Sequence, residues 1–394
     1  MFSIERRGGQ TGAVAVLSTR TGQKRVLVED AAYGRLADTG HLLFVRGGDL
    51  LGTTFNQSRL EISGESIVVQ PGIGYQPGSA SADFTFAAAS GSAAMVFRDS
   101  RYIDQSSFVW VNRQGRGTPT ELVERGFRQP RLSRDGQRLL VDIRDGRSRD
   151  ISIYDFRRSQ LSRLTTDEGE TPMWSPDESS MAWAGGADGK YHILLKRSDG
   201  SDAEHRIWST DEHIHLNAWT PDGKSLLVNA THGQRQTLVE VTLQPSISAR
   251  PFRESKFNEY GAAISPDGRR VAFVSDEAGH ADVYLTARNG VGKVQVSSAG
   301  GTEPVWSGDG RELFYRSGRR LMSVATGTAA LDVGPSRLLF DGPYITSSEG
   351  RDPSYAVSPD GQRFLMMQPV RAEGAEVVVT LNWLEELRTR MLAK

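Results

Sequence analysis

The sequence predicts an all-β protein, a β-propeller built from four-stranded blades. Three observations predict this fold. A short turn motif recurs at intervals of 42 to 51 residues, the strand after each turn is apolar on both faces, and two more polar strands follow in each interval. Repetition of one small sheet with a period of roughly 40 to 50 residues is typical of propeller blades.

The recurring turn is clearest at Ser265-Pro266-Asp267-Gly268. Proline presets the second position of a type I turn, aspartate tolerates the third, and glycine adopts the left-handed fourth. Each turn aspartate is therefore expected to serve its own turn. Because Glu178 stands where glycine is expected, we predict a strained or differently shaped turn there. The eight aligned positions are Gly40, Gly91, Gly136, Glu178, Gly223, Gly268, Gly310 and Gly361.

The strand that follows each turn is apolar at consecutive positions. Val271, Ala272 and Phe273 form one such run, and Leu226, Leu227 and Val228 form another. A strand that is apolar on both faces must be covered on both faces, and neighbouring blades are the only available cover. The more polar pairs 150–156 with 160–166, and 282–288 with 293–298, supply the outer strands.

Eight aligned turns predict eight blades in one ring, with a six-bladed ring from about residue 120 and two leading units as the alternative. The last unit supplies only three strands, and residues 24–29 are predicted to complete it beside the C-terminal strands, which removes two sheet edges. Residues 1–381 would then form a single propeller domain. Residues 382–394 are predicted to form a short helix capped by Asn382, with Trp383, Leu384, Leu387 and Met391 on one face.

Composition narrows the possible functions. The 394 residues carry a net charge of −1, so no strong field favours nucleic acid or an anionic membrane. The chain has no cysteine, which excludes thiolate chemistry and disulfides. No apolar run is long enough for a membrane helix, and the first ten residues do not resemble a signal peptide. We therefore expect a cytoplasmic monomer that does not insert into membranes, or an extracytoplasmic location if the chain is a fragment of a longer membrane-anchored protein.

The turn motif and several longer phrases resemble known proteins. The Ser-Pro-Asp-Gly blades resemble the TolB-like, WD-type propeller repeats of bacteria. Phrases such as "SRLTTDEGETPMWSPD" and "GGTEPVWSGDGRELFYRSGRRLMSV" are similar to the C-terminal propeller region of bacterial membrane-anchored serine/threonine protein kinases. The resemblance covers nearly the whole chain. It implies a sensor or protein-interaction role and not kinase activity, because the chain shows no Gly-rich phosphate loop with a strand lysine and no His-Arg-Asp catalytic loop.

The sequence carries no complete catalytic motif. It has no Gly-x-Ser-x-Gly elbow and no His-Glu-x-x-His zinc motif, so we predict neither catalytic residues nor a cofactor. His213 and His215, two residues apart on a strand, would point to one face and are the best metal candidates. Two histidines do not make a site, so we interpret them as part of a polar segment entering a blade and predict no bound metal.

Polar residues precede or begin the innermost strand of each blade. Because these strands all start at one mouth of the central channel, the residues are predicted to form a mixed-charge ring there. We predict that this ring makes the protein a non-catalytic scaffold for a protein or peptide partner. The alternative is a metal-dependent carbohydrate lyase or hydrolase with its site in the channel, which three or more converging histidines or carboxylates would favour. The predicted ring consists of Arg128, Glu170, His215, Asn217, Glu259, Tyr260, Glu303, Arg351 and Asp352.

Overall fold

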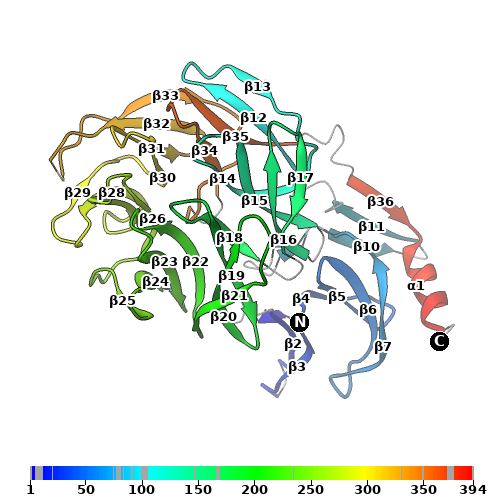
Figure 1. Ribbon diagram of the computed structural model, residues 1–394. Helices are drawn as coiled ribbons and strands as arrows, with labels where there is room; N and C mark the ends of the chain where they lie inside the picture. Colours follow the sequence, from blue (N-terminus) through cyan, green and yellow to red (C-terminus); the bar gives the residue numbers. More distant parts are fainter. Residues whose placement is uncertain are drawn as a thin grey trace. The chain divides into compact units, whose positions relative to one another are not determined.

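Figure 1 shows the computed structural model of the chain. The structure describes residues 2–4, 12–19, 21–73, 75–76, 81–82, 84–89, 92–98, 105–145, 148–165, 169–233, 235–329, 331–347, 350–370 and 377–392. The chain divides into two compact units, which are unit 1 (residues 1–104 and 371–394) and unit 2 (residues 105–370). Residues 1–381, which the sequence analysis predicts to form a single propeller domain, are distributed over both units.

Unit 2 contains six four-stranded antiparallel sheets, called blades 1 to 6 below (Figure 1). In blades 1 to 5 the strands run outward in chain order, whereas blade 6 takes its two inner strands from the end of unit 2 and its two outer strands from the beginning. From the innermost strand outward, blade 1 consists of β14 (Gly126–Leu132), β15 (Arg138–Asp145), β16 (Ser148–Asp155) and β17 (Gln160–Arg163), and blade 2 of β18 (Glu170–Trp174), β19 (Ser180–Ala187), β20 (Lys190–Arg197) and β21 (His205–Thr210). Blade 3 consists of β22 (His213–Trp219), β23 (Ser225–His232), β24 (Arg235–Thr242) and β25 (Ser248–Pro251), and blade 4 of β26 (Glu259–Ile264), β27 (Arg270–Ser275), β28 (Asp282–Ala287) and β29 (Val294–Gln295). Blade 5 consists of β30 (Thr302–Trp306), β31 (Glu312–Ser317), β32 (Arg320–Ala325) and β33 (Arg337–Asp341), and blade 6 of β34 (Tyr355–Val357), β35 (Arg363–Pro369), β12 (Ser106–Asn112) and β13 (Gly117–Pro119).

The six blades close into a ring. The innermost strands are neighbours in the order β14, β18, β22, β26, β30, β34 and back to β14. Six apolar clusters each join two consecutive blades. One of them holds Phe127 of blade 1 together with Leu365 of blade 6 and so closes the circle. The β-propeller prediction is confirmed. The ring of unit 2 has six blades, which agrees with the six-bladed alternative and not with the ring of eight, and its first strand begins at Ser106, before the residue near 120 that the alternative gave.

The second strand of each blade is buried from both sides, as its apolar pattern predicts. In β23, Leu226 and Val228 belong to the cluster shared with blade 2, while Leu227 belongs to the cluster shared with blade 4. In β27, Val271 and Phe273 face blade 3, while Ala272 faces blade 5. Alternate side chains of one strand thus join a blade to both neighbours, because consecutive residues point to opposite faces of a sheet.

The recurring turn has the same hydrogen bonds in all six blades of unit 2. In blade 4, the Ser265 hydroxyl donates to Oδ1 of Asp267 at 2.5 Å, and the same carboxylate oxygen accepts from the backbone N–H of Arg269 at 3.0 Å. The backbone N–H of Arg270 then donates to the Ser265 oxygen. The prediction that each turn aspartate serves its own turn is confirmed. The hydroxyl–carboxylate pairs are Ser133 with Asp135, Ser175 with Asp177, Thr220 with Asp222, Ser265 with Asp267, Ser307 with Asp309, and Ser358 with Asp360.

The predicted pairing of residues 24–29 with the C-terminal strands is wrong. These residues form β3, which pairs with β2, while the C-terminal strand β36 (Val377–Leu381) pairs with β11 (Ser92–Arg98). Blade 6 is completed by β12 and β13 instead. The physical reason is burial: β12 supplies Phe108 to the cluster with blade 1 and Val111 to the cluster with blade 5, and both side chains are almost fully buried.

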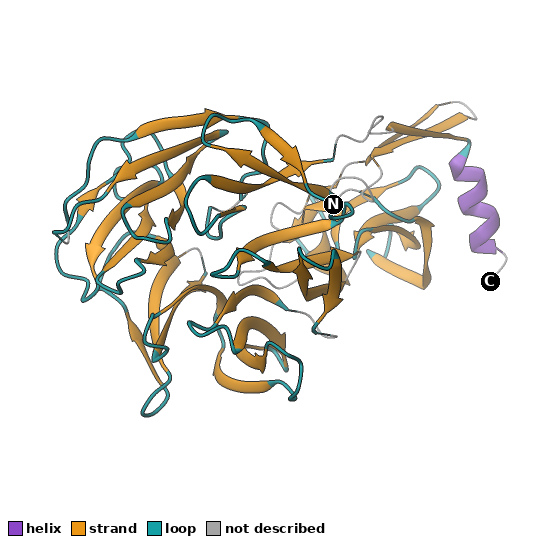
Figure 2. Ribbon diagram, turned by 45° about the horizontal axis from the view of Figure 1, so that its top comes forward, coloured by secondary structure: helices purple, strands orange, loops and turns teal. Residues whose placement is uncertain are grey.

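The described part of unit 1 consists of one four-stranded sheet, two three-stranded sheets, one two-stranded sheet and one helix. Its helix α1 (Trp383–Leu392) buries Trp383, Leu384 and Leu387 in a core shared with strand residues of the same unit. Met391 lies outside the described side chains. Strands dominate the regular structure, as Figure 2 shows, and the described residues contain no helix long and apolar enough to cross a membrane. The remaining strands are β1 (Phe2–Ile4), β2 (Ala13–Leu17) and β3 (Lys24–Glu29); β4 (Ala32–Leu36), β5 (His41–Arg46), β6 (Asp49–Asn56) and β7 (Glu61–Gln70); β8 (Tyr75–Gln76) and β9 (Ser81–Ala82); and β10 (Phe84–Ala89), which pairs with β11.

Candidate functional site

The innermost strands of blades 1 to 5 are each interrupted by a β-bulge. The register shifts between Arg128 and Arg131 in β14 and between Glu170 and Met173 in β18, and similar shifts occur in β22, β26 and β30. Gln129 and Thr171 adopt left-handed backbone angles at these bulges. A bulge turns side chains away from the regular alternation of a strand. Here the side-chain amide oxygen Oε1 of Gln129 accepts from the backbone N–H of Thr171 at 2.7 Å, which links blades 1 and 2.

Most of the predicted ring is buried inside blade contacts. Six members are buried, whereas Arg128, Glu170 and Arg351 are partly exposed. Only Asn217 and Arg351 also line the central cavity described below. Contacts in the structure join His215 to Asp352, Arg351 and Glu170, but most of the predicted ring residues do not present their side chains to solvent. The buried members are His215, Asn217, Glu259, Tyr260, Glu303 and Asp352.

Asp352 is the centre of a buried network that joins three blades. Its Oδ2 atom accepts from Nε2 of Gln129 at 2.8 Å and lies 2.6 Å from Nδ1 of His215. Burial by itself lowers the pKa of His215, but the adjacent Asp352 carboxylate outweighs burial and raises it. Nη1 of Arg351 lies 3.5 Å from Nε2 of the same histidine.

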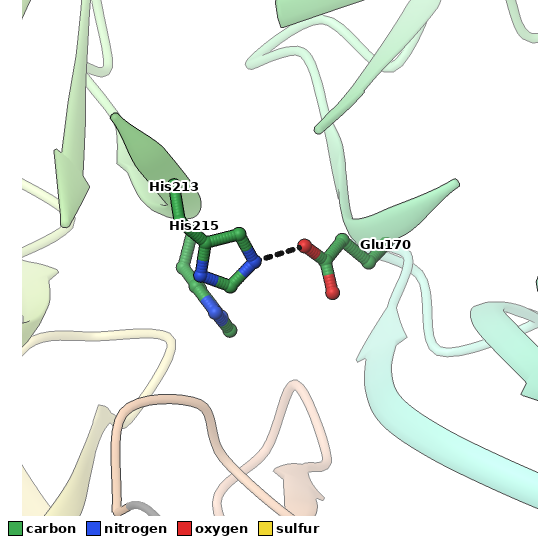
Figure 3. Close-up of side chains that lie close together, drawn as sticks. All are labelled: Glu170, His213 and His215. Atoms are coloured by element: carbon green, nitrogen blue, oxygen red, sulfur yellow. Dashed lines mark hydrogen bonds and ion pairs between the residues drawn. The ribbon is translucent and has the colours of Figure 1, made fainter. Parts of the chain in front are cut away.

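Glu170 and His213 form a second polar pair beside this network. Nε2 of His213 lies 2.9 Å from Oε1 of Glu170, and Figure 3 shows His215 next to them. Arg149 contacts the other oxygen of Glu170 and also donates to Oδ2 of Asp142 at 2.7 Å. Burial raises the pKa of Asp142, whereas for Glu170 the opposing effect of burial is outweighed by His213 and Arg149, which lower its pKa.

Glu303 and Glu259 are held in the interior. The Glu303 carboxylate accepts from the backbone N–H of Ser347 at 2.8 Å and from the N–H and hydroxyl of Ser354 at 2.7 and 2.6 Å. Glu259 lies 3.4 Å from Nε of Arg253. Burial raises the pKa of both glutamates. Glu303 thus ties the segment before β34 to blade 5, which is a structural role.

A cavity of about 740 Å³ lies on the axis of unit 2 and is lined by residues of all six blades. It is bounded by the second halves of the innermost strands and by the recurring turns that follow them. Its aromatic walls are Trp174, Trp219 and Trp306. Its charged lining consists of Arg131, Arg134, Glu178 and Arg351.

One side chain that lines this cavity lacks partners among the described residues. Asn217 is 9% exposed, and neither its amide nitrogen nor its amide oxygen has a hydrogen-bond partner. Arg131 also lines the cavity, and burial lowers the pKa of its guanidinium although the Asp352 carboxylate opposes this effect. Buried polar groups in proteins are almost always paired, so groups without a partner that line a cavity indicate a place for a ligand.

Glu178 marks an irregular turn at the rim of the same cavity. It has a φ of 57°, the left-handed conformation that glycine adopts at the other turns. The predicted strain at this position is therefore present in the structure. Its carboxylate lies 2.9 Å from Nη2 of Arg138, and it also accepts from the backbone N–H of Arg134. The Arg138 guanidinium in turn lies over the ring of Trp174, at 4.7 Å from its centroid.

Sequence reasoning predicted Asn217 but missed Arg131 as a cavity residue and missed Arg149 and Asp142 altogether. Arg131 stands in a cluster of arginines formed by Arg128, Arg131, Arg134 and Arg138. It precedes its turn glycine by five residues and Asn217 precedes its own by six, so both fall on the half of the inner strand that lies next to the turn. Arg149 lies on β16, the third strand of its blade, and no pattern in the sequence indicates that it reaches Glu170.

Comparison with known proteins agrees with this fold. No protein-family model matches the chain. It is 29% identical over 121 residues to the Tol-Pal system protein TolB of Anaeromyxobacter sp. (strain K) and 28% identical over 121 residues to TolB of Anaeromyxobacter dehalogenans (strain 2CP-1 / ATCC BAA-258); each match covers 30% of this chain and 27% of the relative. A TolB-type structure from Agrobacterium tumefaciens matches with a TM-score of 0.53 and 20% identity, over 67% of this chain and 98% of the other. The solved structure supports the β-propeller fold, and the sequence matches show similarity to about a quarter of the length of the TolB relatives.

Proposed function

We propose that this chain is an interaction scaffold that binds a protein or peptide segment in the central cavity of unit 2. The observation that carries the proposal is the unpartnered Asn217 amide, which lines the cavity together with Arg131. A volume of about 740 Å³ falls within the range of sites that bury a ligand, and it suits a short peptide segment better than a folded domain. The Tol-Pal name of the TolB relatives supports a role in a multi-protein system.

The lining indicates the chemistry of the ligand. Three arginines (Arg131, Arg134 and Arg351) and one glutamate (Glu178) give the cavity a positive charge, so the bound segment should be acidic or present a carboxylate. An asparagine amide can donate to and accept from the same peptide group, which suits recognition of an extended backbone. The tryptophan walls offer apolar surface for one or two side chains of the segment.

The test is selection from a defined peptide pool. The purified chain is incubated with random eight-residue peptides, and the retained sequences are determined for the wild type and for Asn217→Ala and Arg131→Gln. Asn289→Ala and Arg337→Gln are matched controls, because both residues are exposed and outside the cavity. We expect the wild type and both controls to enrich acidic peptides, and the cavity variants to lose that enrichment. Enrichment of the same peptides by all five proteins would refute the proposal.

A kinase-linked sensor role, a monomeric state and a cytoplasmic location are finer parts of the proposal. The sensor role is supported only by the phrases that resemble kinase propeller regions. Sequencing the coding region upstream of this chain tests it: a kinase domain and membrane helix in the same reading frame would support the sensor role and an extracytoplasmic location. Light scattering of the purified chain tests the monomer.

One observation favours the second candidate, a metal-dependent lyase or hydrolase. Glu170, His213 and His215 converge, which is the arrangement that the alternative requires. Incubation of the metal-supplemented protein with a panel of acidic and neutral polysaccharides tests this candidate. Release of new reducing ends or unsaturated products that depends on His213 would promote it above the scaffold.

A further inference from the structure

Glu170, His213 and His215 bring three metal-ligand atoms together in blades 2 and 3. The ligand atoms all lie within 4.8 Å of one another. Figure 3 shows the two imidazole rings on one side and the carboxylate on the other, with Nε2 of His213 directed at Oε1 of Glu170. The arrangement lies at the beginning of the inner strands, whereas the central cavity is bounded by their second halves and by the turns. Arg351 adjoins both places, because it lines the cavity and its Nη1 lies 3.5 Å from Nε2 of His215.

The strand geometry explains why these side chains meet. His213 and His215 are two residues apart on β22, so both point to the same face of the strand. Their ring centroids are 4.8 Å apart and the rings are nearly perpendicular, at 88°. Glu170 is the first residue of β18, and β18 is the neighbouring inner strand. The two histidines and the carboxylate are therefore fixed by two adjacent strands and not by loops.

Two of the three ligands, His215 and Glu170, are each held in place by a further charged side chain. Oδ2 of Asp352 lies 2.6 Å from Nδ1 of His215, so the other ring nitrogen of His215, Nε2, points away from the Asp352 carboxylate. Histidines that bind metal usually donate their other ring nitrogen to a carboxylate or carbonyl in this way. Arg149 contacts Oε2 of Glu170 and so leaves Oε1 directed at His213.

We propose that Glu170, His213 and His215 bind one divalent first-row transition metal ion, with Zn²⁺ as the best match. Two imidazoles and one carboxylate form a donor set that Zn²⁺ accepts, with a fourth position open to water or a ligand. The ion takes the place of the direct contact between Nε2 of His213 and Oε1 of Glu170, which lie 2.9 Å apart. The side chains of His213 and Glu170 are 22% and 17% exposed, so the ion can enter from solvent.

Binding requires a small closure of the three side chains. Two ligands of one Zn²⁺ ion at about 2.0 to 2.2 Å cannot lie more than about 4.4 Å apart, so the widest pair has to move together by a few tenths of an ångström at least. The nearby Arg149 and Arg351 repel a cation, and Arg351 must move away from Nε2 of His215. We therefore expect Zn²⁺ to bind more weakly here than at a structural zinc site without neighbouring cations.

The test measures metal binding directly. The full chain is stripped with a chelator, and Zn²⁺ is titrated by calorimetry, with the bound equivalents measured by elemental analysis after dialysis. Co²⁺ titration adds a spectroscopic signature, because visible bands report its coordination by protein ligands. We expect about one equivalent of Zn²⁺ in the wild type, and at least tenfold weaker binding in His213→Ala and Glu170→Gln. Asp352→Asn should weaken binding by about 10- to 100-fold.

Matched controls separate this site from surface histidines. His232 is exposed and lies 3.5 Å from Glu212, so His232→Ala removes a histidine–carboxylate pair that has no third metal ligand among the described residues. His232→Ala and the cavity variant Asn217→Ala should bind Zn²⁺ like the wild type. Circular dichroism and the melting temperature show whether each variant is folded. Less than a tenth of an equivalent in the wild type, or equal Zn²⁺ affinity in the wild type and the folded Glu170→Gln variant, would overturn the proposal.

Discussion

Nδ1 of His215 lies 2.6 Å from Oδ2 of Asp352, and the side chains are only 8% and 5% exposed. The contact joins the inner strand of blade 3 to the segment that precedes the inner strand of blade 6, across the axis of the ring. Asp352 also accepts from Gln129 of blade 1. A single carboxylate therefore connects three blades that are far apart in the sequence.

Removal of that carboxylate should destabilise unit 2. Asp352→Ala leaves His215 and Gln129 without their buried partner, and loss of one member of a buried polar pair costs about 3 to 5 kcal/mol. Asp360→Ala removes an exposed turn carboxylate from the same blade and should cost about 1 kcal/mol. Melting temperatures of both variants measure the difference. Equal shifts would contradict the central role of Asp352.

Replacement of Glu303 should also destabilise the protein. The carboxylate accepts three hydrogen bonds from Ser347 and Ser354 and is fully buried. Glu303→Ala leaves these donors without a partner, at a cost of at least about 2 kcal/mol. This expectation differs from the partner-binding role that the sequence analysis predicts for Glu303 as a ring residue. Chemical denaturation measures the loss, and an unchanged midpoint would show that the buried hydrogen bonds are not important.

The irregular turn at Glu178 predicts an order of stability. Glycine fits the left-handed backbone there, whereas alanine keeps the strain and loses the contact with Arg138. Glu178→Gly should therefore be more stable than Glu178→Ala by about 1 kcal/mol. Thermal unfolding of the two variants gives the comparison. The reverse order would mean that backbone strain does not matter at this turn.

The turn aspartates predict loss of stability in acid. The hydroxyl of Ser175 is the main cause that lowers the pKa of Asp177 to about 2, and the corresponding aspartates of the other blades also have lowered pKa values. A lowered folded-state pKa gives stability that is present above the unfolded value of 3.8 and is lost as the pH falls through the folded value. The melting temperature should therefore fall between about pH 4 and pH 2. The fall should be smaller in a variant with Asp177→Asn and Asp309→Asn, and an equal fall would contradict the assignment.

Ring closure by β12 predicts that unit 2 folds alone. A fragment of residues 105–370 contains both halves of blade 6 and all six inter-blade clusters. It should unfold cooperatively and elute as a monomer. Val111→Asp in the fragment places a charge in the buried contact between blades 5 and 6 and should abolish folding. A fragment that aggregates without this substitution would show that unit 1 is needed to complete the propeller.

The blades could be predicted from the repeat because the residues of each turn and of the strand that follows it determine the local structure. Ser265, Asp267 and Gly268 are sufficient to specify one turn, and Leu226 to Val228 show burial on both faces. The closing strand was not predictable, since β12 carries no turn motif and its partner β35 lies more than 240 residues later. The degenerate turns near Gly40 and Gly91 gave the false count of eight; Gly40 belongs to unit 1, and Gly91 lies outside the described residues.

The candidate site was predictable only in part. The start of each inner strand could be placed, which brought Glu170, His215 and Asp352 together correctly. Whether each of these side chains is buried depends on how the β-bulge of its strand orients it and on which residue of another blade faces it. The sequence therefore could not show that Glu303 is buried, that Asn217 has no partner, or that Glu170 meets His213.

The affinity of one selected acidic peptide for the wild type and for Arg131→Gln, measured by calorimetry at low and high salt, tests the central claim most directly. If the cavity binds an acidic segment, the variant should bind at least tenfold more weakly than the wild type, which corresponds to about 1.4 kcal/mol. The difference should shrink at high salt, because the attraction between the arginine and the carboxylate is screened. Equal affinity for the folded variant and the wild type at both salt concentrations would contradict the account and exclude the cavity as the binding site.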